Sequence, residues 1–187
     1  MKKLMIVMAA IALAGVTQAA SFNWKTSTGQ YVYQAGTSTK LSGATAYLFD
    51  AAVVSQTALL GGILNEGKSI GSFSSLSSKA TSSSGAIATT EFEYTPSGSP
   101  STITAYFAIV SGDNVFISST ADAAVSDVGV STLGFGSLNA ASKAAASEFS
   151  GSASSAGWYK AAAVPEPTSG LLMLVGLGAL ALRRRRA

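Results

Sequence analysis

The sequence of 187 residues predicts a mostly β fold, a single β-sandwich or jelly-roll-like domain with one or two short helices. One observation behind this prediction is a pair of β-branched, apolar runs joined by a short turn that contains glycine. Another is a run in which apolar and acidic residues alternate with a period of two, as in a strand with one buried face. The third is low charge: residues 21–163 hold six lysines against eight acidic residues, a net charge of −2, which favours folding over disorder.

The first predicted elements are a strand and a helix. Ala44 to Phe49 is rich in strand-forming residues and stops at Asp50. Asp50 is predicted to cap a helix, because Ala51 to Leu60 is apolar at helical spacing and ends at the glycine pair 61–62. The stretch Ser69 to Gly85 is rich in serine and is predicted to be a flexible loop.

A strand with two different faces is predicted over Thr89 to Thr95. Phe92 and Tyr94 fall on one face, while Glu91 and Glu93 fall on the other, because successive side chains of a strand point to opposite sides. We therefore expect one face of this strand to be buried and the other to meet solvent.

The best-defined unit is a β-hairpin. Thr102 to Val110 and Asn114 to Thr120 are apolar and β-branched, and residues 111–113 (Ser-Gly-Asp) form a short turn between them. The first of these two runs is apolar on both faces, which predicts a central strand of the domain.

The remaining third of the domain shows weaker patterns. Ala121 to Val130 and Leu133 to Leu138 are ambiguous, and residues 134–136 (Gly-Phe-Gly) are typical of a loop or a bent strand. Asn139 to Phe149 is rich in alanine and predicts a helix of about three turns. Ser150 to Ser155 predicts a second flexible loop, and Gly157 to Lys160 predicts the closing strand.

Residues 1–20 are predicted to be a secretory signal peptide. Two lysines precede the apolar core Leu4 to Val16, which is too short to span a membrane comfortably. Small residues follow this core, and cleavage before Ala20 or before Ser21 fits equally well. The candidate cleavage residues are therefore Ala19 and Ala20, and signal peptidase is an expected partner.

The segment of residues 164–187 has three parts. The two prolines around Glu166 cannot continue a helix or a central strand and predict an extended hinge. The apolar run Gly170 to Leu182 predicts a transmembrane helix, placed at residues 169–182. From Thr168 to Leu182 this helix would be about 22 Å long at 1.5 Å per residue, shorter than a hydrocarbon core of roughly 30 Å. A single span remains feasible because arginine side chains can snorkel to the interface and the bilayer can thin locally. Four basic residues follow and are expected to stay in the cytoplasm: Arg183, Arg184, Arg185 and Arg186.

This three-part ending resembles the PEP-CTERM sorting signal of Gram-negative bacteria, over residues 164–187 only. The resemblance implies recognition by exosortase, a multi-pass membrane cysteine transpeptidase that cuts near the motif and passes the protein toward the cell surface or extracellular polymer. It also implies that the apolar run is a transient anchor and the arginine cluster a stop-transfer signal. The recognition motif would be Pro165, Glu166 and Pro167. The alternative is a plain bitopic anchor that is never cut.

Charge and composition exclude several classes of function. The whole chain has a formal charge of +3 and a pI of about 9.2. Six cationic residues at the two ends account for this, so no nucleic-acid partner is expected. The chain has no His and no Cys, which excludes a Ser-His-Asp triad, a cysteine nucleophile, a disulfide and any metal site built on imidazole or thiolate. No catalytic residue, metal site or cofactor is assigned, and we expect the domain not to be an enzyme.

Three groups of residues offer weaker alternatives. Glu91 and Glu93 lie about 7 Å apart along one strand face, a tolerable spacing for a glycosidase pair, although glutamates on a solvent face are common. Two pairs of side chains could donate oxygens to calcium, but neither has the dense acidic spacing of a calcium loop, so calcium binding is disfavoured: Asp113 with Asn114, and Asp122 with Asp127. Five aromatic side chains could form an exposed platform on which sugars stack, but packing in the core or at its edge is the favoured role: Trp24, Tyr31, Tyr33, Trp158 and Tyr159.

These observations together predict an exported precursor with a transient membrane anchor, delivered to the cell surface, the outer envelope or the extracellular matrix. The favoured hypothesis is a non-enzymatic structural or matrix protein that interacts with exopolysaccharide or neighbouring surface proteins. The alternative is a carbohydrate-binding module or adhesin that recognises exopolysaccharide.

Overall fold

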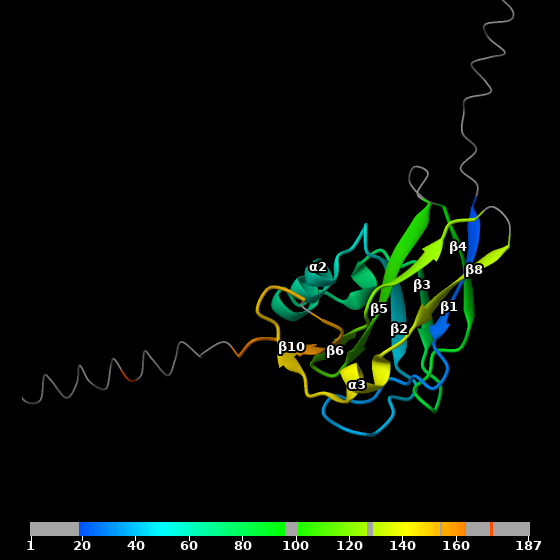
Figure 1. Ribbon diagram of the computed structural model, residues 1–187. Helices are drawn as coiled ribbons and strands as arrows, with labels where there is room; N and C mark the ends of the chain where they lie inside the picture. Colours follow the sequence, from blue (N-terminus) through cyan, green and yellow to red (C-terminus); the bar gives the residue numbers. More distant parts are fainter. Residues whose placement is uncertain (1–18, 96–100, 127–128, 154, 164–172, 174–187) are drawn as a thin grey trace, which may run out of the picture.

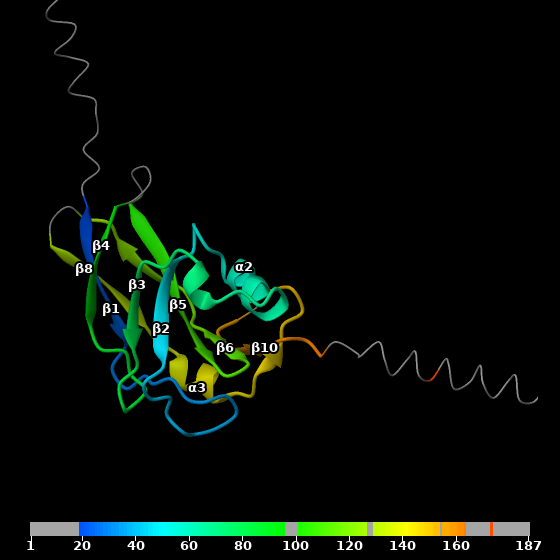
Figure 2. The same ribbon diagram turned by 180° about the vertical axis from the view of Figure 1, so that it is seen from behind.

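The computed structural model describes residues 19–95, 101–126, 129–153, 155–163 and 173 (Figure 1). Within these residues the chain is mostly β, with two sheets and a few short helices, which confirms the predicted fold class at this level. Figures 1 and 2 show the smaller sheet on one side of the larger sheet and helix α2 on the other side. The predicted signal peptide up to residue 18 and the predicted anchor helix, except Met173, lie outside the described residues.

The smaller sheet has the strand order β4-β1-β8. Strand β1 (Ala20–Thr26) pairs antiparallel with β4 (Thr90–Tyr94) and parallel with β8 (Val130–Phe135). Alternate side chains of β1, among them Phe22 and Trp24, are fully buried against the larger sheet, as the period of two in a strand requires. The prediction of a two-faced strand at β4 is confirmed, since its aromatic face is buried or half-buried and its glutamates are exposed.

The larger sheet has the order β3-β2-β5-β6-β10-β9, and β7 also pairs with β5. Its central strand β5 is buried on both faces over most of its length, as the sequence predicts. The strands of this sheet are β2 (Thr45–Asp50), β3 (Ser77–Ala80), β5 (Thr102–Ser111), β6 (Asn114–Ile117), β7 (Ala121–Ala124), β9 (Ser147–Glu148) and β10 (Gly157–Lys160).

The predicted hairpin is formed by β5 and β6. Ser111 pairs with Asn114, so two residues, Gly112 and Asp113, make the turn. Gly112 has a φ of +58°, a left-handed conformation that glycine adopts at little cost and that tight hairpin turns require.

Two apolar clusters lie on the two faces of the larger sheet. The cluster between the sheets is dominated by aromatic rings, and Phe107 and Phe135 meet edge to face with their centroids 5.0 Å apart. The cluster on the opposite face is covered by the helices and by Phe149, which packs against Tyr159. Both faces of the larger sheet are therefore buried, which gives the domain its core without any disulfide.

The first helix differs from its prediction. Helix α2 (Gln56–Leu60) begins after Ser55, whose hydroxyl caps it, and not after Asp50. Asp50 instead closes a turn by accepting a hydrogen bond from the Ala52 backbone N–H. The glycine pair does not end the helix either, because the chain continues as a π-helical turn, η1 (Gly61–Asn65). The prediction failed because Ser55 offers a second cap at the proper distance from the buried leucines.

The second predicted helix is about half as long as expected. Helix α3 spans Leu138–Lys143 only, and the chain then forms β9. Strand β9 pairs parallel with β10, and the backbone N–H of Phe149 donates to the Lys160 carbonyl. Burial of Phe149 in the second cluster pulls this segment onto the sheet edge, which overrides the helix propensity of its alanines.

Two other segments are more regular than predicted. The serine-rich stretch contains a 3-10 turn, η2 (Ile70–Ser72), and the edge strand β3, which pairs with β2. The ambiguous segments become the strands β7 and β8, and Gly134 and Phe135 are the last residues of β8. Of the second serine-rich stretch, the described residues form no helix or strand.

Candidate functional site

The predicted processing residues are only partly described. Ala19 is exposed and lies directly before β1. Ala20 is the first residue of β1, is 2% exposed and pairs with Tyr94. The sorting motif and the arginine cluster lie outside the described residues: Pro165, Glu166, Pro167, Arg183, Arg184, Arg185 and Arg186.

The folded domain ends very close to the sorting motif in sequence. Residues 161–163 are exposed and follow β10 directly. From Lys160 to Pro165 the chain can extend over at most about 18 Å. The last strand is held firmly, because the indole N–H of Trp158 donates to the Tyr33 carbonyl at 3.0 Å and to the Ser142 carbonyl at 2.9 Å.

No helix within the described part of the chain has the length and apolar character needed to span a membrane. The predicted span at residues 169–182 lies outside that part, apart from Met173, which is exposed.

The structure does not assemble the aromatic residues into a sugar-binding platform. Trp24, Tyr33, Trp158 and Tyr159 are all less than 9% exposed and belong to the core or its edge. Tyr31 is half-buried, and the Lys40 ammonium lies 3.9 Å from the centre of its ring. The favoured interpretation, core and edge packing, is confirmed for the four buried residues.

The candidate acidic sites also stay apart. Glu91 and Glu93 are exposed on the outer face of β4. Asp113 is exposed in the hairpin turn, and Asp122 accepts a hydrogen bond of 2.6 Å from the Thr104 hydroxyl. Asp127 lies outside the described residues, and within them no three acidic side chains gather closely enough to hold a metal ion.

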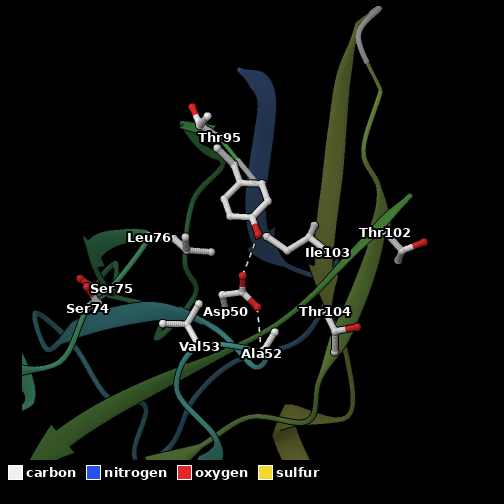
Figure 3. A pocket seen from close by; sticks show the side chains of 11 residues that line it. Asp50, Ala52, Val53, Ser74, Ser75, Leu76, Thr95, Thr102, Ile103 and Thr104 are labelled. Carbon is white, nitrogen blue, oxygen red and sulfur yellow. Dashed lines mark hydrogen bonds between the residues drawn. The ribbon is translucent and has the colours of Figure 1, made fainter. Parts of the chain in front are cut away.

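A hollow of about 490 Å³ lies where the two sheets open at one end (Figure 3). Its walls come from the end of β2, the end of β4, the start of β5 and the loop before β3. Apolar side chains form much of the lining, with Leu76 and Ile103 on opposite sides and Val53 at the rim, 68% exposed. Five hydroxyl residues complete it: Ser74, Ser75, Thr95, Thr102 and Thr104.

The polar centre of this hollow is a pair of side chains from the two sheets. The Tyr94 hydroxyl donates to Asp50 Oδ2 at 2.8 Å, and the Ala52 N–H donates to Asp50 Oδ1 at 2.8 Å (Figure 3). Burial raises the pKa of Tyr94 to about 12, with further contributions from the hydrogen bond to Asp50 and from the negative charge of Asp50. Tyr94 therefore remains a hydrogen-bond donor at neutral pH and ties β4 to β2.

Sequence reasoning missed this site because it assigned Asp50 to a helix cap. The two residues are 44 positions apart, and no local pattern connects them. One signal was available: Asp50 is a single carboxylate that ends an apolar strand, a position where a charged side chain lies close to the core.

Comparisons with known proteins bear on the tail and not on the hollow. No curated protein and no solved structure matches the chain. The family model for the PEP-CTERM protein-sorting motif matches residues 163–186. The C-terminal tail of this chain is therefore a PEP-CTERM sorting motif, which indicates export and exosortase-dependent sorting to the cell surface or the extracellular space.

Proposed function

We propose that the domain between the two chain ends is a non-enzymatic structural or interaction protein of the cell surface or extracellular matrix. The supporting observation is that every aromatic side chain in the described part of the chain is buried or half-buried. Proteins that bind sugars commonly offer exposed aromatic faces for stacking, and none of the aromatic side chains in the described residues is exposed to that degree. This disfavours the alternative, a carbohydrate-binding module or adhesin that recognises exopolysaccharide.

The outer face of the smaller sheet supports a role in lateral contacts. Cross-strand neighbours on this face are polar: Glu93 lies beside Ser21, and Glu91 lies beside Asn23, with Thr132 on the other side of Asn23. Such a face offers hydrogen-bond donors and acceptors over several neighbouring strand positions, as a lateral contact with another surface needs.

The positions of the acidic residues support the non-enzymatic character. General acid and base catalysis needs two titratable groups that converge on one substrate position. In the described part of the chain, the two glutamates of β4 point to solvent, and the buried Asp50 is already bonded to Tyr94 and Ala52. The missing His and Cys remove the usual nucleophile-activating groups.

The sorting route supplies the first test. We propose that exosortase cuts near the motif and that the apolar run anchors the precursor only until then. Replacing Pro165, Glu166 and Pro167 by alanine in the native host should leave the full-length chain in the membrane fraction, measured by immunoblot of membrane and released fractions. The control replaces the exposed alanines 161 and 162 by serine, because these two residues precede the matched residues 163–186 and their replacement keeps the motif and the chain length. Unchanged release of the alanine variant would show that another signal is read, and retention of the wild type itself in the membrane fraction would show that the tail is a plain anchor.

A glycan array tests the role of the domain. The processed protein, isolated from the released fraction, should bind no defined glycan saturably, while a strain that lacks the protein should lose cohesion of its extracellular polymer. Saturable binding to one glycan class would instead establish the carbohydrate-binding alternative.

A further inference from the structure

The carboxylate of Asp50 is buried without a cation. Asp50 is 4% exposed, yet both hydrogen bonds that it accepts come from neutral donors, the Tyr94 hydroxyl and the Ala52 N–H. The ion pairs found within the described residues join Lys68 to Glu66 and Lys160 to Glu148, and neither involves this carboxylate. Buried charges in proteins are normally paired with an opposite charge, so Asp50 is incompletely compensated.

A cation that compensates Asp50 could be accommodated in the hollow beside it. None of its lining residues is basic, so the hollow has a negative centre and no positive group of its own. A carboxylate has about four acceptor positions, and the two observed hydrogen bonds leave about two of them free. A cationic donor that enters the hollow can therefore bond to Asp50 without displacing Tyr94 or Ala52.

The walls indicate which kind of cation fits. A metal ion would need several further oxygen ligands, and no cluster of acidic residues lies here within the described part of the chain. The walls instead combine hydroxyl groups with apolar side chains, and the apolar ones include Leu76 and Ile103 on opposite sides of the acidic centre and Val53 at the rim (Figure 3). Such walls suit the methylene chain of an organic cation, whose charged end can also lie against the ring of Tyr94.

We propose that this hollow binds a primary alkylammonium group, carried by a free amine or by a lysine side chain of a neighbouring protein. The ammonium group donates to the free acceptor positions of Asp50, and the methylene groups pack between Leu76 and Ile103. The volume of about 490 Å³ accommodates a chain of four or five carbons. The site is distinct from the outer face of the smaller sheet and does not depend on the proposed structural role.

Calorimetric titration of the full-length protein in detergent tests the proposal. n-Butylammonium chloride is titrated into the protein, with a titration into protein-free micelles subtracted. n-Butanol and sodium chloride at the same concentrations test the apolar part and the ionic strength separately. We expect saturable binding of n-butylammonium only, and a loss of roughly tenfold or more in affinity for Asp50→Asn, which removes the charge of the acceptor. Absence of saturable binding overturns the proposal.

A second pair of variants guards against misfolding of Asp50→Asn. Val53→Lys places an ammonium group at the rim of the hollow, on an exposed side chain, and should abolish binding by competing for Asp50. Val130→Lys adds the same charge on the smaller sheet, at a residue that is 48% exposed and outside the hollow, and should leave binding unchanged. Equal binding by both variants and the wild type overturns the proposal even if Asp50→Asn does not fold.

A peptide arm distinguishes the two sources of the amine. A short peptide with one lysine is compared with the same peptide carrying acetyl-lysine, which has no charge. Tighter binding of the lysine peptide than of n-butylammonium assigns the site to a protein partner. Equal or weaker binding of the lysine peptide assigns the site to free amines. If acetylation leaves the affinity of the peptide unchanged, the ammonium group is not what the hollow recognises and the proposal fails.

Discussion

Replacing Trp158 by phenylalanine tests how the last strand before the sorting tail is held in the domain. Trp158 is 2% exposed and lies on β10. Its indole N–H is shared between the carbonyls of Tyr33 and Ser142, at 3.0 and 2.9 Å. Phenylalanine keeps an aromatic ring against Phe116 but offers no donor, so both carbonyls lose this partner.

The expected loss in the free energy of unfolding follows from a comparison with the other tryptophan, Trp24. Trp24 is fully buried, and its indole N–H donates to a single hydroxyl, Ser77 Oγ, at 3.2 Å. Trp24→Phe removes the same atoms as Trp158→Phe, so the loss of apolar contacts and the cavity are similar in the two variants. The two variants therefore differ in the groups that lose a hydrogen-bond partner. Trp158→Phe leaves two buried carbonyls without this donor, whereas Trp24→Phe leaves one hydroxyl, which can rotate toward another partner. At about 1–3 kcal/mol for an unsatisfied buried group, Trp158→Phe should lose about 1–3 kcal/mol more than Trp24→Phe.

Urea unfolding of the two variants and the wild type, followed by far-ultraviolet circular dichroism in one detergent, measures this difference. The slope of the free energy with urea concentration should be the same for all three, because the surface exposed on unfolding is unchanged. Equal free energies of unfolding for the two variants, at equal slopes, would refute the argument from the shared indole donor.

Two further predictions concern Tyr94 and a glycine turn. Because the pKa of Tyr94 is raised from 10.0 to about 12, the unfolded chain loses this proton first as the pH rises, so the free energy of unfolding should fall between pH 10 and pH 12. After allowance for solvent screening of this partly exposed side chain, Tyr94 contributes about 1 kcal/mol to this fall. Alkaline denaturation curves of Tyr94→Phe should lack that contribution. An identical fall in the variant would show that Tyr94 is not its source. Gly85 has a φ of +73°, and a Cβ there would lie 2.5 Å from the Val32 carbonyl oxygen. Gly85→Ala should therefore lower the free energy of unfolding, measured by thermal denaturation, by at least about 2 kcal/mol. The control Gly112→Ala, whose Cβ meets nothing within 4 Å, should lower it by about 1 kcal/mol. Equal losses would show that backbone strain, and not the close contact with Val32, determines the effect.

Local patterns in the sequence predict the elements whose partners are close in the chain. The hairpin of β5 and β6 needs only two β-branched runs and a glycine in the turn, and it forms as predicted. The alternation in β4 likewise places its glutamates outside and Phe92 inside. The PEP-CTERM tail is a linear signal that is read as sequence, and the family model matches it at residues 163–186.

The elements that sequence reasoning missed depend on distant partners. Strand β1 pairs in parallel with β8, which follows it by more than a hundred residues, and nothing near either strand specifies that register. The predicted helix over residues 139–149 stops early because Phe149 is buried against Tyr159 and β9 completes the sheet edge. Contacts of this kind outweigh helix propensities, which amount to only a few tenths of a kcal/mol per residue.

The sequence by itself therefore determined the mostly β class, the central hairpin and the sorting tail of this protein, because each depends on periodicity or on a short linear motif. Only the tertiary structure decided that Asp50 meets Tyr94 across the two sheets and that a hollow lined by apolar and hydroxyl side chains opens beside them. The physical reason is that Asp50 and Tyr94 are 44 residues apart, so their hydrogen bond forms only once both sheets have packed. The same packing buries the carboxylate of Asp50 away from any cationic side chain of the described residues, so its unpaired charge also depends on the tertiary structure.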